Sequence, residues 1–312
     1  MLMVREDPFH LMRKLYSINK MEINNKIYDK ITIIIVLYNS TELVLECLKA
    51  IKNFKIIIVD NGKNKRILKI IKENYFIEKI VTLKKNLGFG VGINSGVSFV
   101  KTDFFLMLNP DAIISLETIN KLYTTSVENN ATASAPWVKD DSSCYGLFPE
   151  SSKGVRRSKN EINSAKILDN YKPEGNCCVQ VHKCCALLVS KKEFIHIGMF
   201  NPKYFLFWEE IDLCRKFRNN KLSLILNPEC EMIHQQGNSV NNSIYTYFIK
   251  TFNTEYSPFI YFDIRKNSKF LYWRLIKYAF RSVCYLGILN VKNSFKNIIK
   301  FTAIIYFIFK SK

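Results

Sequence analysis

The stretch FFLMLNPDA, residues 104–112, decides the fold of this chain. A continuous apolar run that ends abruptly at polar residues is typical of a strand buried on both faces of a parallel sheet. Pro110 fixes its own φ angle and pushes Asn109 toward extended geometry, so the carboxylate of Asp111 is held just beyond the strand end. We therefore expect Asp111 at the carboxyl edge of a parallel sheet, where such sheets bind their ligands.

Three further apolar runs precede this strand and alternate with helical spacing. They are ITIIIVLY at 31–38, KIIIVD at 55–60 and EKIVTL at 78–83. A later run, CVQVHKCCALLVS at 178–190, predicts another strand. Strands that alternate with helices predict an α/β fold, with a Rossmann-like, mixed and mostly parallel sheet covered by helices on both faces.

The basic charge of the chain is concentrated at its C-terminal end. Of 312 residues, 46 are Lys or Arg and 27 are Asp or Glu, a formal net charge of +19, and residues 241–312 hold twelve basic residues but only two acids. This excess indicates a polyanionic partner: nucleic acid, an anionic membrane surface or a phosphorylated substrate. We expect a polar lead-in over 1–30, one domain over 31–240, and a basic, aromatic region over 241–312.

The last segment, residues 270–312, interleaves aromatic and aliphatic residues with Lys and Arg. Its longest uncharged run, Ser282–Val291, has ten residues, whereas a span across a bilayer takes about 20. Basic residues recur at spacings of three and four, which predicts a basic amphipathic helical region along an anionic leaflet. The alternative is a packed helix pair with a solvated basic face.

Cysteine use and the N-terminal sequence both favour a cytoplasmic protein. The nine cysteines are scattered and form no CxxC motif, which indicates reduced thiols. The start MLMVREDPFH places acidic residues and a proline where a signal peptide needs an apolar stretch.

Polar residues follow the predicted strands, and each has two interpretations. Asp60 precedes an Asn-Gly turn, where it either closes an Asx turn or accepts hydrogen bonds from a base or ribose. The glycine-rich stretch NLGFGVGIN at 86–94 is either a turn that opens a helix or a phosphate cradle, although its spacing departs from GxGxxG. Asp111 is either a turn residue or an oxygen ligand of a hard divalent cation.

A second group of candidates lies in FLFWEEID, residues 205–212. Acids at the start of a helix commonly interact with the helix dipole. Alternatively, one of them is a general base among aromatic side chains. His234 ends the apolar strand LSLILNPECEMIH, and a lone histidine in such a place is more often structural than catalytic.

Six segments in this order resemble the family 2 glycosyltransferases, and within them the bacterial rhamnosyltransferase-like branch. They are IIIVLYNS, IIIVDNG, NLGFGVGIN, LNPDA, IGMFNPKYFLFWEEIDLC and LNPECEMIH, spread over about residues 31–236. The resemblance implies a GT-A fold, a divalent cation (Mg²⁺ or Mn²⁺), and inverting transfer from a nucleotide-diphosphate sugar, dTDP-rhamnose being favoured. It implies a saccharide or polyprenyl-diphosphate-linked acceptor in surface-polysaccharide or cell-wall synthesis, with the protein peripheral at the cytoplasmic face of the inner membrane and without a nucleic-acid partner.

The resemblance also implies roles for individual residues. Asp111 and His234 correspond to metal-site residues, and Glu209-Glu210 corresponds to the family's Glu-Asp pair, whose acidic side chain deprotonates the acceptor hydroxyl. The acceptor side that it implies includes Cys184, Trp208 and Asp212. The nucleotide pocket that it implies contains Tyr38, Asn39, Asp60, Asn61, Asn86, Gly88, Phe89, Gly90, Asn94 and Asn109.

Five positions depart from the family pattern. Cys184 stands where a glycine is usual beside the acceptor pocket, and Lys221 replaces a helix-ending glycine. Glu210 and Lys216 replace an aspartate and an arginine, and Asn201 stands where an aspartate usually follows the Gly-x-Phe turn. The longer Glu210 side chain leaves open whether Glu209 or Glu210 is the base. The same change leaves a second possibility, that the protein is a catalytically impaired family member that acts as an assembly partner. The basic net charge leaves a nucleic-acid-binding protein as a further alternative. Loops over 137–176 are expected to set the specificity.

Overall fold

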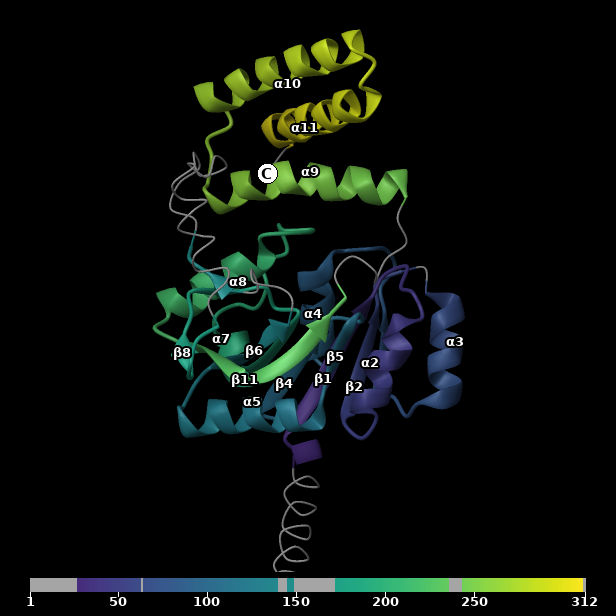
Figure 1. The fold of residues 1–312 in the computed structure, drawn as a ribbon, viewed down its shortest axis with the longest axis vertical. Coiled ribbons are helices and arrows are strands. Elements are labelled where there is room, and N and C mark those ends of the chain that lie inside the picture. Colours follow the sequence, from purple (N-terminus) through teal and green to yellow (C-terminus); the bar gives the residue numbers. More distant parts are fainter. Residues whose placement is uncertain (1–26, 63, 140–144, 149–171, 236–242, 311–312) are drawn as a thin grey trace, which may run out of the picture.

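The computed structural model of the chain describes residues 27–62, 64–139, 145–148, 172–235 and 243–310. Most of the predicted lead-in and most of the predicted specificity loops lie outside these residues. The described residues form a sheet-centred domain with a layer of three helices stacked against one edge of the sheet (Figure 1).

A nine-stranded mixed sheet forms the centre of the domain, in the order β3-β2-β1-β4-β10-β6-β11-β5, with β8 paired to β11. Most of its strands run in one direction, and β5, β8 and β10 run in the other. The strands are β1 (Ile31–Leu37), β2 (Lys55–Asp60), β3 (Lys79–Thr82), β4 (Phe104–Leu108), β5 (Ala112–Ile114), β6 (Ala133–Lys139), β8 (Cys177–Cys178), β10 (Ala186–Ser190) and β11 (Leu224–His234). Two short strands, β7 (Tyr145–Gly146) and β9 (Val181–His182), pair separately.

Helices cover both faces of the sheet, as the sequence predicted. Along β1, Ile33 and Ile35 belong to one buried core and Ile34 and Val36 to the other, because successive side chains of a strand point to opposite faces. Helices α2 (Leu43–Ile51), α3 (Lys65–Asn74) and α5 (Leu116–Glu128) complete the first core, and α4 (Phe89–Val97), α7 (Lys191–His196) and α8 (Glu209–Asn219) complete the second.

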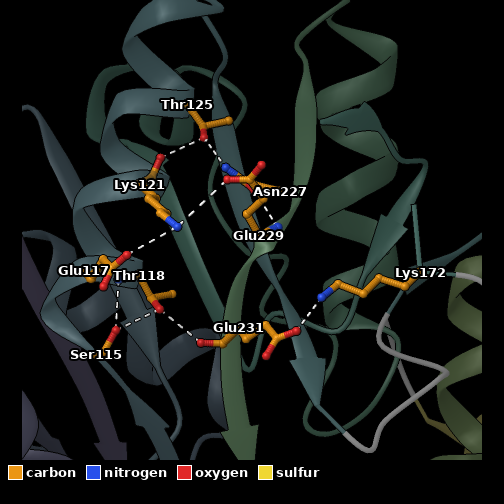
Figure 2. Close-up of polar contacts among 9 residues, drawn as sticks. All are labelled: Ser115, Glu117, Thr118, Lys121, Thr125, Lys172, Asn227, Glu229 and Glu231. Carbon is orange, nitrogen blue, oxygen red and sulfur yellow. Dashed lines mark hydrogen bonds and ion pairs between the residues drawn. The ribbon is translucent and has the colours of Figure 1, made fainter. Parts of the chain in front are cut away.

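An irregularity in β11 is held in place by helix α5 (Figure 2). The register of β11 against β6 shifts between Asn227 and Glu231. Asn227 donates to the hydroxyl of Thr125 at 2.8 Å, and Thr118 donates to the carbonyl oxygen of Glu231 at 3.0 Å. A slip of one residue would turn every later side chain of β11 to the opposite face, so these contacts fix the direction of His234 at the end of the strand.

The C-terminal region is helical, with α9 (Ile244–Tyr261), α10 (Lys269–Gly287) and α11 (Val291–Phe309). Helix α9 lies nearest the sheet, and α10 and α11 form a hairpin packed on it (Figure 1). The prediction that the basic residues lie together along one helical face at an anionic leaflet is wrong for Arg274, which is buried and donates to Glu255 and to Tyr278 at 2.7 Å. None of the described helices has both the length and the hydropathy needed to cross a bilayer.

Candidate active site

A cavity of about 470 Å³ opens at the carboxyl edge of the sheet, and helix α9 forms part of its lining. Its lining comes from segments that follow β1, β2, β3, β4 and β11, and from the start of α8. Parallel strands bring their carboxyl ends to one edge, which explains why segments so far apart in the sequence meet there. The predicted site residues that line the cavity are Tyr38, Asn61, Asn86, Gly88, Phe89, Asn109, Asp111, Glu209, Glu210 and His234.

Asp111 and His234 meet at one end of this cavity. Residue 234 pairs with Ala112 across the antiparallel β5–β11 ladder, which brings its Nε2 to 3.2 Å from Oδ1 of Asp111. The side-chain amide nitrogen of Asn109 also lies 3.2 Å from this nitrogen. In the tautomer in which the amide donates, Nε2 is unprotonated, and its single lone pair would pass from this hydrogen bond to a bound cation. Among the described residues, Asp111 Oδ1 has no hydrogen-bond partner although it is buried.

These two atoms, Asp111 Oδ1 and His234 Nε2, are suited to be two of the ligands of a divalent cation. A carboxylate oxygen and an imidazole nitrogen are both cation ligands, and a buried carboxylate oxygen without a donor is costly unless a cation or proton satisfies it. No group of three or more His, Cys, Asp or Glu side chains with metal-site geometry occurs in the described part of the chain. A cation here would therefore take its remaining ligands from water and from phosphate oxygens, as Mg²⁺ commonly does.

Glu209 and Glu210 form the second polar group of the cavity. Burial raises the pKa of Glu209 well above its ordinary value, and the charge of Glu210 raises it further. Burial also raises the pKa of Glu210, but backbone donors at the start of α8, the side chain of Glu209 and the charge of Lys183 oppose this shift. The side-chain contact between the two raises the pKa of Glu209 and lowers that of Glu210, which favours Glu210 as the carboxylate of the pair.

The backbone immediately before this pair is strained. Phe207 and Trp208 have φ angles of +64° and +71°, a region that costs a non-glycine residue about 1–3 kcal/mol. The ring of Trp208 packs between Tyr261 and Phe262, with centroids 5.1 and 5.6 Å away. The end of helix α9 thus holds the turn that aims the two glutamates into the cavity.

Asn61 and Asn86 tie the end of β2 to the glycine-rich segment. Asn61 donates to the side chain of Asn86 at 2.8 Å and to the carbonyl oxygen of Gly88 at 3.0 Å. Gly88 has a φ of +90°, and a Cβ there would lie 2.1 Å from the carbonyl oxygen of Phe205. Only glycine allows this approach, so the segment joins the sheet edge to the FLFW turn.

Four residues predicted for the nucleotide pocket lie behind the lining of the cavity. Asp60 accepts from the backbone of Gly62 and from Asn64, which is the Asx-turn interpretation of this residue. Asn94 bonds in both directions to the backbone of Phe200, and a Cβ on Gly90 would lie 2.9 Å from Phe200 Cβ. Asn39, Asp60, Gly90 and Asn94 therefore support the pocket rather than line it.

The three residues predicted for the acceptor side also lie outside the lining. Asp212 pairs with Arg215 at 2.6 Å, and the guanidinium of Arg215 lies 4.0 Å from the ring centroid of Tyr261. Together with Trp208, this contact joins α8 to the end of α9. Cys184 is buried, and its neighbour Cys185 lines the cavity instead.

Sequence reasoning missed the part of the lining that helix α9 contributes. Tyr245, Thr246, Ile249 and Lys250 share one face of this helix and lie over the cavity. Their spacing was visible in the sequence, but nothing local indicated which face would meet the domain. Lys183 also lines the cavity, so two lysine side chains, those of Lys183 and Lys250, lie in the same cavity as the acidic residues.

The departures from glycine at Cys184 and Lys221 coincide with left-handed backbone. Their φ angles are +56° and +57°, which explains why a glycine is usual at both positions. The left-handed residue at 184 also ends extended pairing, so the single strand predicted over 178–190 is wrong and the segment forms β8, β9 and β10.

Replacing Lys221 with glycine is expected to stabilise the protein by about 0.5–1 kcal/mol, because the left-handed penalty disappears. The exposed Lys221 follows helix α8, where Leu222 N–H closes the helix end on the carbonyl oxygen of Phe217 at 2.9 Å. Chemical denaturation measures the change. The matched control Lys69→Gly, at an exposed position inside α3, should destabilise by a similar amount; equal losses in both variants would contradict the prediction.

Comparison with known proteins assigns the chain to a family. The profile described as "Glycosyl transferase family 2" matches residues 32–191. The low-salt glycan biosynthesis hexosyltransferase Agl10 of Haloferax volcanii is 24% identical over 227 residues, which are 70% of this chain and 71% of that protein.

Two solved structures are similar over 72% of this chain. GalNAc-T7, crystallised with UDP, GalNAc and Mn²⁺, is 13% identical with a TM-score of 0.49, and S. aureus TarS is 14% identical with a TM-score of 0.47. The chain matches only 50% and 38% of the lengths of these two structures. The family profile itself covers just over half of this chain, including the strand ends that carry Asn61, Asn86 and Asp111, and the chain therefore belongs to glycosyl transferase family 2.

Proposed function

We propose that this protein is an inverting glycosyltransferase that moves a hexose from a nucleotide-diphosphate sugar to a hydroxyl group of a saccharide acceptor. One observation carries the proposal: a single cavity contains both the Asp111–His234 pair and the Glu209–Glu210 pair. Direct displacement needs charge neutralisation at the leaving diphosphate and a base at the attacking hydroxyl, and these two pairs suit those two tasks.

Asp111 and His234 are the residues that would hold a divalent cation, Mg²⁺ or Mn²⁺. When bound, such a cation supplies Lewis-acid neutralisation of charge on the departing diphosphate. Asn109 orients His234, and the contacts between α5 and β11 fix the direction of that imidazole. The two cavity lysines, Lys183 and Lys250, add positive charge around an anionic substrate.

Glu210 is the proposed general base. It takes the proton of the acceptor hydroxyl, and the oxygen attacks the anomeric carbon from the face opposite the diphosphate. The bond between the anomeric carbon and the diphosphate oxygen breaks in the same step, so the configuration inverts. In this assignment Glu209 carries a proton and donates it in a hydrogen bond to Glu210, which holds the base in place; the side-chain contact between the two, which raises the pKa of Glu209 and lowers that of Glu210, supports it.

The donor that we favour is dTDP-rhamnose, which delivers L-rhamnose, and the acceptor is a saccharide on a polyprenyl-diphosphate carrier at the cytoplasmic face of the inner membrane. The order of the rhamnosyltransferase-like motifs supports the donor. The name of Agl10, a hexosyltransferase of glycan biosynthesis, supports a role in building a surface polysaccharide.

A panel of nucleotide sugars, with and without Mn²⁺, tests this function by thermal unfolding. At 100 times its dissociation constant, the correct donor should stabilise the protein by about 2.7 kcal/mol, and Mn²⁺ should increase the effect. A stabilisation limited to dTDP-rhamnose identifies that donor, and a different single donor corrects it. No stabilisation by any nucleotide sugar would refute the transferase function and favour an assembly partner.

A further inference from the structure

Helix α10 presents its large apolar side chains outward. Trp273, Ile276, Phe280 and Val283 are 59%, 70%, 69% and 69% exposed. Their spacings of three, four and three residues place them along one face of the helix, and we call these four residues the outer stripe. Single exposed apolar residues are normal on a protein surface, but a continuous row of large ones marks an interaction site.

The inner face of the same hairpin buries polar contacts beside an apolar cluster, in which Leu271 of α10 and Ile304 of α11 pack with Phe259 of α9. Arg274 and Tyr278 of α10 form a buried network with Glu255 of α9, in which Tyr278 donates to the carboxylate at 3.0 Å. Ser282 and Ser294 share a buried hydrogen bond of 2.8 Å between α10 and α11. A helix pair surrounded by water turns its apolar side inward. This hairpin has its own buried apolar cluster and still leaves the outer stripe exposed, so the stripe is apolar surface that the packing within the protein does not use.

The tip of the hairpin continues the apolar surface. Leu286, Ile288, Leu289 and Val291 lie at or beside the turn between α10 and α11, and Leu289 is 87% exposed. Figure 1 shows α10 as the outermost layer, on the side of α9 away from the sheet. The outer stripe and the tip can therefore touch a large flat surface without any change in the catalytic domain.

The charge around this surface identifies its partner. No acidic residue follows Asp263, whereas exposed Lys269, Arg281, Lys292 and Lys296 flank the apolar residues. A second copy of the chain would bring these like charges together, and a nucleic-acid backbone would leave the outer stripe in water. An anionic bilayer satisfies both features, since its acyl boundary accepts apolar side chains and its headgroups attract lysine and arginine.

We propose that the α10–α11 hairpin docks on an anionic lipid bilayer, with the outer stripe and the tip at the acyl boundary. Lys277, whose Nζ lies 5.2 Å from the ring centroid of Trp273, reaches the headgroup level from the stripe. The inference deepens the proposed function, and only the role of docking rests on that function. The hairpin packs on α9, which lines the cavity, so docking would hold the cavity near a lipid-linked acceptor.

Vesicle binding of the full chain tests the proposal without any enzymatic assay. Co-sedimentation compares vesicles of phosphatidylcholine with vesicles that contain phosphatidylglycerol, and we expect strong binding only to the anionic ones. The double variant Ile276→Asp/Phe280→Asp should bind at least about 100-fold more weakly, because it removes two inserted side chains. Phe76→Asp is the matched control, since Phe76 is 76% exposed in the catalytic domain, and it should bind like the unmodified chain.

Insertion depth gives a second readout. Lipids brominated on their acyl chains should quench the fluorescence of the bound protein, and Trp273→Phe should abolish that quenching. Unchanged binding of the double variant, or unquenched Trp273, would overturn the proposal and indicate a purely electrostatic contact. A concentration-dependent dimer that the double variant abolishes, without vesicle binding, would show that a second copy covers the outer stripe. Thermal unfolding with donors is measured separately, so the proposed catalysis and the docking can fail independently.

Discussion

Glu210→Gln is expected to lower kcat by about 10²- to 10⁴-fold, the usual loss when a general base is removed. Glu209→Gln should lower it by less than about tenfold, because a glutamine amide can still donate the hydrogen bond that holds Glu210. Both side chains keep their size, so packing around the buried pair is preserved. Steady-state transfer or donor hydrolysis measures kcat, and donor stabilisation in thermal unfolding verifies that both variants still bind the donor.

The pH profile separates a base from a structural acid. Burial raises the pKa of Glu210, and a base acts only when deprotonated, so kcat should rise with pH along an acid limb displaced upward from that of an ordinary glutamate. The limb should persist in Glu209→Gln and disappear in Glu210→Gln. Loss of activity in Glu209→Gln alone would reverse the two roles. Glu210→Asp, which restores the residue usual in the family, should retain activity.

Asp111→Asn is expected to abolish the effect of Mn²⁺ on donor binding and to lower kcat by about 10²- to 10³-fold, the usual loss when one element of transition-state charge stabilisation is removed. The change keeps the shape of the side chain but replaces one carboxylate oxygen with a nitrogen that cannot bind a cation. Titration of Mn²⁺ against donor stabilisation in thermal unfolding measures the first effect. Transfer kinetics measure the second.

Asp60→Asn provides the matched comparison at the same edge of the sheet. Asp60 lies behind the cavity lining, and its Oδ1 accepts from Gly62 and Asn64, a role that an asparagine oxygen can also perform. This variant should keep the Mn²⁺ effect and should change the donor KM more than kcat. If Asp60→Asn removes the Mn²⁺ effect and Asp111→Asn leaves it intact, the assignment of the cation site to Asp111 is wrong.

The strand ends of the candidate site follow directly from sequence patterns. Asp60, the glycine-rich segment and Asp111 all follow predicted strands, and of these Gly88 and Asp111 line one cavity at the carboxyl edge of the sheet, whereas Asp60 is not part of its lining. Alternation along a strand and the dihedral limits of proline and glycine are local properties, so they can be read without knowing the partners of each segment. The left-handed backbone at Cys184 and Lys221 was likewise indicated by positions where the family carries glycine.

Residues beside the site were harder to assign because their roles depend on distant partners. Asn94 resembles a pocket residue in sequence but bonds to Phe200, more than a hundred residues later. Gly90 provides room for that same phenylalanine rather than for a phosphate. Asp212 pairs with Arg215, which packs on Tyr261 of α9. In each case the residue type was informative about polarity or size but not about the atom it would contact.

The sequence by itself determined the mixed α/β sheet, the edge at which ligands gather, and the carboxylates placed there, because these depend on periodicity and turn chemistry within short segments. The tertiary structure alone decided that one face of α9 closes the cavity and that α10 leaves the outer stripe of apolar side chains exposed. Both are choices between two faces of a helix, and an amphipathic pattern identifies the faces without saying which one meets the protein. That choice depends on packing free energy among segments far apart in the chain, which only the folded arrangement reveals.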